Sequence, residues 1–344
     1  MVIPVGINIT NLAKIGVDIL AANLFGRRAP VNVMFSLTDR CQQRCLYCGI
    51  PFRGKPEMDT KQILNLIDQL KKAGTRRIAL WGGEPLLRKD IGSIIDYVKE
   101  KGIFLTLDTN GFLVPEKIQE IRNLDILAVS LDGAKDVHDR IRGKGSFDQA
   151  MAGIRTAIKY MPVWTITVLN KYNLEQVDFI LDLAKKTGFY ATFQVLHHSK
   201  ELAGNTSEYL PSNEEYRKCI RKLIERKKNN KRIVSSIGYL NYILGWDNFR
   251  NGHALDQKNS KLKCWAGKLY CNIDTDGSVW PCSVMIGEMG SHNALKMGFR
   301  AAFDNMPQIP CNSCNAACFV EYNYICSLHV GIAWNLLKNI KVRF

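Results

Sequence analysis

The sequence predicts an α/β protein: a partial (β/α)6 TIM-like barrel followed by a small cysteine-rich domain. Three observations support this prediction. Six apolar runs alternate with segments of helical period between residues 31 and 198, and each run ends in a polar turn that often contains glycine. The pattern then breaks into a polar, basic stretch, and seven of the eleven cysteines lie between residues 264 and 326. With 46% hydrophobic residues, the 344-residue chain can bury a core of barrel size.

The six apolar runs are the predicted strands. They are rich in β-branched and aromatic residues and almost continuously hydrophobic, as strands buried on both faces of a parallel sheet are. They cover residues 31–37, 77–81, 103–107, 126–131, 163–169 and 190–196. Strands that alternate with helices favour a parallel barrel, and an open doubly wound sheet is the alternative.

The segments between the strands have the period of amphipathic helices. Residues 59–74 place Ile63, Leu66, Ile67 and Leu70 on one face, with Asp59 or Thr60 as the N-cap and Gly74 as the stop. Three further helices of this kind are predicted over 89–102, 146–161 and 173–188.

Changes in composition divide the chain into five parts. We expect an N-terminal amphipathic helix in 1–30, the barrel in 31–198 and a basic helical bridge in 199–263. The cysteine-rich domain then covers 264–326, and a second amphipathic helix covers 327–344. The bridge also holds Cys219, which we interpret as an ordinary buried thiol.

Charge and targeting features narrow the class of protein. No apolar run reaches the ~18–20 residues of a membrane span, and the N-terminus lacks the features of a signal peptide. We expect the protein to be cytoplasmic. In that reducing compartment, cysteines more often bind metals or take part in redox chemistry than form disulfides. The net charge of +15 indicates acidic partners. Its densest basic run, 217–232, has no interleaved aromatic residues, which disfavours nucleic acid and favours a solvated helix face.

Three cysteines follow the first predicted strand on a polar loop. Cys41, Cys45 and Cys48 are one ligand short of a structural zinc site, which closes with four. A [4Fe–4S] cluster held by three thiolates would keep one iron open for another ligand. Zinc with a distant fourth ligand remains the alternative.

This loop, with Tyr47 just before its last cysteine, resembles the signature of the radical S-adenosylmethionine (SAM) superfamily. The resemblance implies an enzyme whose open iron binds SAM and whose cluster cleaves SAM reductively. The resulting 5′-deoxyadenosyl radical would abstract a hydrogen atom from the substrate. Cys41, Cys45 and Cys48 are then the catalytic cluster ligands.

The resemblance also assigns candidate SAM contacts at the strand ends. The GGE stretch of Gly82, Gly83 and Glu84 would hold the amino group of SAM, where a plain strand-to-helix turn is the alternative. Ser130 and Asp132 would contact the ribose and the methionine. Arg142, or else Arg140, would pair with the carboxylate, unless both are surface charges. The remaining candidates are Tyr47, Asn110, Asn170 and Leu196, for which helix capping or core packing is the alternative.

Two histidines directly follow the sixth predicted strand, at the same end of the sheet. His197 and His198 are candidates for substrate-facing acid–base groups, although a structural role is favoured for such residues.

The second cysteine set resembles the auxiliary-cluster domain called SPASM or, when shortened, twitch. The resemblance implies one further [4Fe–4S] cluster, held by Cys264, Cys282, Cys311 and Cys314. A hairpin at residues 275–278 would bring Cys264 and Cys282 together. Cys318 is a substitute ligand, and a second, incompletely ligated cluster would use Cys271, Cys318 and Cys326. A zinc ribbon is the alternative.

Three hypotheses for function follow. The first is radical chemistry on a peptide or protein substrate, with an acidic electron donor of the flavodoxin or ferredoxin type. The second is the same chemistry on a membrane lipid or lipid-linked sugar, at an anionic membrane surface that the chain's amphipathic ends would contact. The third, of another class, is a non-catalytic, zinc-stabilised protein that binds nucleic acid.

Overall fold

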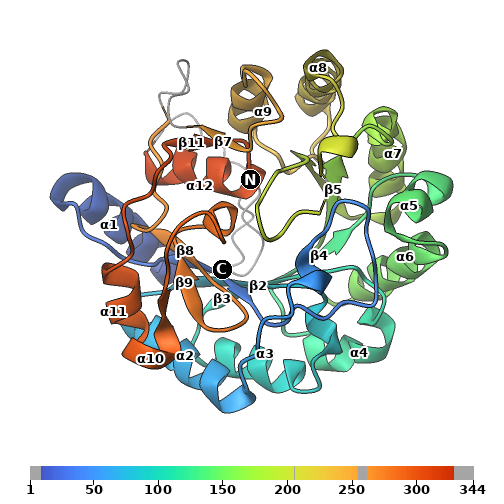
Figure 1. Cartoon of the computed structure of the whole chain (residues 1–344). Helices are drawn as coiled ribbons and strands as arrows, with labels where there is room; N and C mark the ends of the chain where they lie inside the picture. The colour runs from blue at the N-terminus through green and yellow to red at the C-terminus, as the bar shows by residue number, and fades with distance from the viewer. Residues whose placement is uncertain (1–8, 205, 255–261, 329–344) are drawn as a thin grey trace.

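A nine-stranded sheet curves through the molecule, with most helices on its outer face (Figure 1). The computed structural model describes residues 9–204, 206–254 and 262–328. Six strands pair in parallel, in the order in which the chain forms them. These are β1 Asn32–Ser36, β2 Arg77–Trp81, β3 Phe104–Thr109, β4 Ile126–Ser130, β5 Val163–Leu169 and β6 Tyr190–Val195. All six predicted strands are confirmed, and their carboxyl ends meet on one rim.

Helices connect these strands on the outside of the sheet. They are α2 Thr60–Ala73, α3 Ile91–Glu100, α4 Val114–Ile121, α5 Lys135–Arg142, α6 Ser146–Ala157 and α7 Val177–Thr187. The capping signals predicted for α2 are confirmed: Asp59 forms a capping box with Gln62, and Gly74 ends the helix in the left-handed conformation. The short helices α4 and α5 are not among the four predicted.

The cysteine-rich region extends the barrel's own sheet. Strand β8 Tyr270–Ile273 pairs in parallel with β1, so that Met34 lies opposite Asn272. Strand β9 Ser278–Trp280 returns antiparallel through the predicted hairpin, and β10 His292–Asn293 forms the edge. The sheet is not closed, because β6 and β10 lie at opposite ends of the strand order. One hydrophobic core runs from Ile19 to Cys326.

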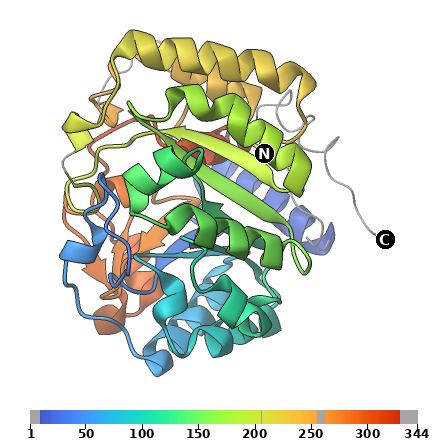
Figure 2. The same ribbon diagram turned by 90° about the vertical axis from the view of Figure 1, so that its right-hand side faces the viewer.

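The described part of the chain between the two regions contains two helices and a short strand. It contains α8 Asn213–Asn229, α9 Ile237–Leu244 and the short strand β7 His253–Ala254. Helix α8 lies on the outside of α7 (Figure 2). Two residues of α8, Lys222 and Arg226, form ion pairs with Asp178 of α7. After the hairpin come α10 Ala294–Met297, α11 Phe299–Asp304, β11 Ser313–Cys314, which pairs with β7, and α12 Ala317–Cys326. Five 3-10 turns complete the described chain, over Ile50–Phe52, Pro85–Leu87, Leu174–Gln176, Thr206–Glu208 and Ser283–Met285.

The predicted N-terminal helix is α1 Ile9–Phe25. Ile19 is buried and Ile15 packs against the core, so this part of the predicted apolar face is directed inwards. A second apolar row, Val17, Leu20 and Leu24, with Phe25 beside it, is exposed. The predicted C-terminal helix of 327–344 falls almost entirely outside the described residues. No helix in the described ranges has both the length and the apolar character to cross a bilayer.

Candidate active site

The three-cysteine loop leaves β1 and packs directly on the GGE turn. The amide of Gly83 donates to the carbonyl oxygen of Thr38 (2.7 Å), and that of Glu84 donates to the carbonyl of Arg40 (2.8 Å). A Cβ atom on Gly83 would lie 2.3 Å from the Arg40 oxygen, and one on Gly82 would lie 2.4 Å from the Thr38 oxygen. Both glycines are therefore required by the close approach of the loop that carries Cys41.

The three thiols of the loop are electrostatic neighbours and half-buried. Burial, together with the nearby Cys45 and Cys41, raises the pKa of Cys48 to about 11. Burial also raises the pKa of Cys45, while the adjacent Arg142 opposes the rise. Thiolates clustered in this way repel one another, so a cationic metal group that binds all three would relieve the repulsion. The donor set therefore fits an iron–sulfur cluster held by three thiolates.

A buried ion pair supports the loop from the end of β4. Asp132, which is fully buried, accepts a hydrogen bond from Arg142 Nε at 2.6 Å. The same guanidinium donates to the Tyr47 hydroxyl (2.7 Å) and lies 3.7 Å from the Cys45 sulfur. Asp132 also accepts from Tyr47 (3.2 Å) and from the Val168 amide (3.0 Å). The structure thus gives Tyr47, Asp132 and Arg142 protein partners at the cluster loop.

Glu84 is held at the end of β2 by donors from β3. Its carboxylate accepts hydrogen bonds from the Thr109 hydroxyl (2.8 Å) and from the amides of Asn110 (2.8 Å) and Leu86 (3.0 Å). Complete burial raises the pKa of Glu84 to about 7, against the opposing effect of these donors. The Glu84 side chain therefore links the carboxyl ends of β2 and β3 beside the cysteine loop.

The other candidate SAM contacts differ in their surroundings. Asn110 lies at the loop, with its amide nitrogen 3.8 Å from the Cys41 sulfur. Asn170 is buried in a turn and accepts from the Tyr172 amide. Leu196 is buried, and Ser130 is partly exposed at the end of β4. The role of each toward SAM stays a prediction.

The two rim histidines and Arg140 have partners elsewhere. His197 Nδ1 lies 2.9 Å from Asn315 Oδ1 and so joins the barrel to the cysteine-rich region. His198 pairs with the Thr206 hydroxyl at 3.1 Å. Arg140 stacks on Tyr172, 3.8 Å from the ring centroid.

Sequence reasoning missed a buried charge network that ties the loop to the β8–β9 hairpin. Arg53 binds Asp39, two residues before Cys41, and also binds Asp274 at 2.7 Å. Lys55 binds Asp274 at 2.9 Å, and the Thr275 hydroxyl donates to Asp39 at 3.1 Å. The acidic residues flank predicted strands and turns, but only the pairing of β8 with β1 brings them together.

The second cysteine set contains one group of four. Burial raises the pKa of Cys314, and the nearby thiols of Cys264, Cys282 and Cys311 raise it as well. Cys282 interacts in turn with Cys264 and Cys311. The hairpin of residues 275–278 thus brings Cys264 and Cys282 together, as predicted.

The other three cysteines of this region are dispersed. Cys271 is buried in β8 beside Arg28, and Cys318 lies nearest to Asp108 and Arg77. Cys326 interacts with Cys264. These three cysteines thus have different neighbours, and a second cluster on them stays a prediction.

The spacing of the thiols does not by itself select a metal. Within the described ranges, no three or more His, Cys, Asp or Glu side chains are gathered closely enough to hold a metal ion. A mononuclear zinc site would need sulfurs at ~2.3 Å from one ion. The expectation of an iron–sulfur cluster therefore rests on the resemblance of the sequence to the radical SAM superfamily.

Comparison with known proteins agrees with this arrangement. Residues 35–184 match the radical SAM superfamily. AdoMet-dependent heme synthase of Methanosarcina barkeri is 29% identical over 80% of this chain and 83% of its own length. Mycofactocin maturase MftC of Mycolicibacterium smegmatis is 28% identical over 76% of this chain and 66% of its own length. SuiB of Streptococcus suis, solved with S-adenosylmethionine, has a TM-score of 0.66 at 14% identity, covering 87% of this chain and 70% of that one. The form of SuiB bound to precursor peptide SuiA, which covers 87% of this chain and 69% of that one, has a TM-score of 0.64 at 15% identity.

The fold and these matches define the class: residues 35–184 of the chain match the radical SAM superfamily, and the fold is shared with solved proteins such as SuiB. The chain is an enzyme with a radical SAM region and a cysteine-rich C-terminal region.

Proposed function

We propose that the protein cleaves SAM reductively at a [4Fe–4S] cluster held by Cys41, Cys45 and Cys48, and abstracts hydrogen from a peptide substrate. A cluster held by these thiolates would supply the electron for cleavage and would bind SAM. The chain's own residues hold the loop: Gly82 and Gly83 admit its backbone, and Arg142 orients Tyr47 beside Cys45. A second cluster on Cys264, Cys282, Cys311 and Cys314 would assist by exchanging electrons.

The observation that carries the proposal is the convergence of three interacting thiols with four strand ends. The loop after β1 rests on the turn after β2, contacts Asn110 after β3 and is braced by Asp132 after β4. Such a rim is where barrels of this kind place their chemistry. The partly exposed Ser130 hydroxyl and the turn of Gly82, Gly83 and Glu84, whose carboxylate is buried against β3, are proposed to contact SAM there.

Anaerobic reconstitution tests the first step. The protein with iron and sulfide should develop a brown chromophore, and dithionite with SAM should yield 5′-deoxyadenosine. Replacing Cys41, Cys45 and Cys48 with Ala should abolish this product. Cys219→Ala is the matched control, because Cys219 is buried in α8 against the carbonyl of Leu174. Retained cleavage in the triple variant would refute the assignment.

The choice of a peptide rests on the maturase relatives and on SuiB, whose structure contains a precursor peptide. Co-expression with short peptides encoded beside the gene, followed by mass spectrometry, tests it. A loss of two hydrogens or a new cross-link is expected in one peptide. An iron porphyrin carrying carboxylates serves as the contrasting substrate, since the chain also resembles a heme synthase. Turnover of that porphyrin, with all peptides unchanged, would overturn the peptide assignment.

One observation favours the lipid alternative. Helix α1 exposes Val17, Leu20, Leu24 and Phe25, with Phe25 82% exposed, and Arg27 follows. An apolar row next to basic residues suits the surface of an anionic membrane. Co-sedimentation with vesicles of phosphatidylglycerol should lose most of the bound protein when Leu24 and Phe25 are replaced by Ser. Unchanged sedimentation would remove α1 from this role.

A further inference from the structure

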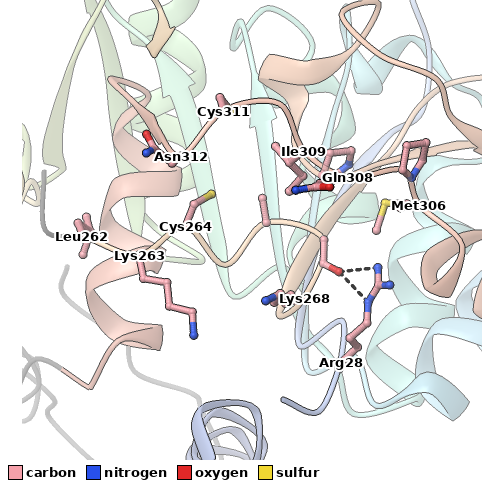
Figure 3. A pocket seen from close by; sticks show the side chains of 14 residues that line it. Arg28, Leu262, Lys263, Cys264, Lys268, Met306, Gln308, Ile309, Cys311 and Asn312 are labelled. Carbon is pink, nitrogen blue, oxygen red and sulfur yellow. Dashed lines mark hydrogen bonds between the residues drawn. The ribbon is translucent and has the colours of Figure 1, made fainter. Parts of the chain in front are cut away.

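A cavity of about 550 Å³ opens between the linker that follows α1 and the cysteine-rich region. Cys264 and Cys311, two of the four clustered cysteines, line it. Three cationic residues, Arg28, Lys263 and Lys268, line it as well (Figure 3). In this view the three cations lie along one side, below the two cysteines.

The described side chains that line this cavity give it a positive charge. None of its lining residues is acidic, and within the described ranges no carboxylate forms an ion pair with the three cations. Arg28 uses its guanidinium to bind carbonyl oxygens of Gly267 (2.8 Å), Phe303 (2.7 Å) and Asp304 (2.6 Å). It therefore fixes the cavity wall, and the nearby Asp304 carboxylate offsets part of its charge. Lys263 and Lys268 are exposed at the same opening.

The same cavity is the solvent-facing side of the four-cysteine group. Cys264 and Cys311 are half-buried, whereas Cys282 and Cys314 are buried. A cluster on these ligands would approach the protein surface here, beside apolar side chains such as Met306 and Ile309. An apolar centre with a charged rim is the usual composition of a protein-binding patch.

We propose that this cavity and its rim are the docking site of an acidic one-electron carrier protein, which exchanges electrons with the cluster of Cys264, Cys282, Cys311 and Cys314. The proposal rests on the proposed function, because it needs that cluster. In one direction the reduced carrier loses one electron and the cluster gains it; in the other, an electron taken from the substrate leaves to the oxidised carrier. The net charge of +15 steers an acidic protein toward the chain, and the cavity gives the encounter a defined place. Electron-transfer encounters use small interfaces, which suits a site of this size.

Charge reversal tests the docking site. The reconstituted holoenzyme is titrated with purified flavodoxin as the acidic probe, and the Kd is measured at low and high salt. Lys263→Glu combined with Lys268→Glu should weaken binding by about tenfold or more at low salt, with little difference at high salt. The control is Lys185→Glu with Lys186→Glu, the same charge change at two exposed residues of α7. It should weaken binding by less than about threefold, because only long-range steering changes.

A second readout separates docking from integrity of the clusters. Stopped-flow reduction by flavodoxin should slow in the cavity variant, while SAM cleavage driven by dithionite stays at the wild-type rate. If wild-type protein fails to cleave SAM with dithionite, the proposed function fails, whereas the binding comparison still judges the docking site.

Two results would overturn the docking proposal. Equal weakening by both variants would show that net charge alone attracts the carrier. Unchanged flavodoxin binding, with loss of inorganic phosphate binding in the cavity variant, would assign the cavity to a small anion.

Discussion

Gly83→Ala gives the sharpest test of how the catalytic loop is held. The backbone of Gly83 has no positive φ, so alanine is conformationally acceptable there and only space opposes it. The added Cβ would lie 2.3 Å from the Arg40 oxygen and 2.6 Å from the Asp39 oxygen, where real contacts stay beyond 3.0 Å. The Arg40 carbonyl must therefore retreat by at least about 0.7 Å, and Cys41 is the next residue.

The cost can be set from comparable changes. Overpacking at a rigid site costs ~1–3 kcal/mol. The two amide hydrogen bonds from Gly83 and Glu84 to this loop contribute ~1 kcal/mol each, and both would be strained. We expect a loss of about 2–4 kcal/mol in the free energy of unfolding of the apoprotein, measured by urea denaturation. Iron bound at the three-cysteine site should fall to less than about half.

A glycine with open surroundings provides the control. Gly16 lies in α1, and no atom comes within 4 Å of the position that an added Cβ would take, so Gly16→Ala should be neutral or stabilising by up to ~1 kcal/mol. If Gly83→Ala keeps full iron content and unfolds like the wild type, the close packing of the two turns does not hold the cysteine loop.

Three further outcomes are expected. Arg142→Lys should lower the free energy of unfolding by ~3 kcal/mol, because one ammonium cannot replace the contacts to Asp132 and Tyr47. Arg140→Lys is the control and should change the free energy of unfolding by less than ~1 kcal/mol. Equal effects of the two substitutions would contradict the role of the buried pair of Arg142 and Asp132. Cys314→Ala should remove about four irons per chain, whereas Cys318→Ala should remove none, as measured by iron analysis. Loss of iron in Cys318→Ala would show that Cys318 is a ligand. Burial lowers the pKa of His138 to about 4 from 6.5, so its neutral form stabilises the fold fully above pH 6.5. That stability, about 3 kcal/mol, should be lost as the pH falls from 6.5 to 4, and urea midpoints of His138→Asn should lack this component.

The barrel strands could be predicted because each is apolar along nearly its whole length. Residues 77–81 and 163–169 were predicted with the bounds that the structure has. The α4 helix was missed because it is only eight residues long and offers few turns of helical period. Strand β8 was missed as a neighbour of β1, because pairing between residues so far apart in sequence leaves no local signal.

The candidate site was predictable where spacing carries the chemistry. Cys41, Cys45 and Cys48 are close in sequence, so the short loop between them is enough to gather their thiols. The Asp39–Arg53–Asp274 network was beyond prediction, since a buried charge looks like a surface charge until its partner is known. Cys318 shows where spacing is not enough: it follows Cys314 closely in sequence, yet its nearest charged neighbours are Asp108 and Arg77, and its role as a substitute ligand stays a prediction.

The parallel pairing of β8 with β1 has a consequence for synthesis of the chain. Strand β1 emerges early from the ribosome, but the strand that covers its outer edge begins only at Tyr270. At ~5–20 residues per second, that edge stays unpaired for roughly 10–50 s. An exposed strand edge invites pairing with other chains. Truncations that end before residue 270 should therefore aggregate, and a chaperone that shields the nascent edge should raise the yield of folded protein.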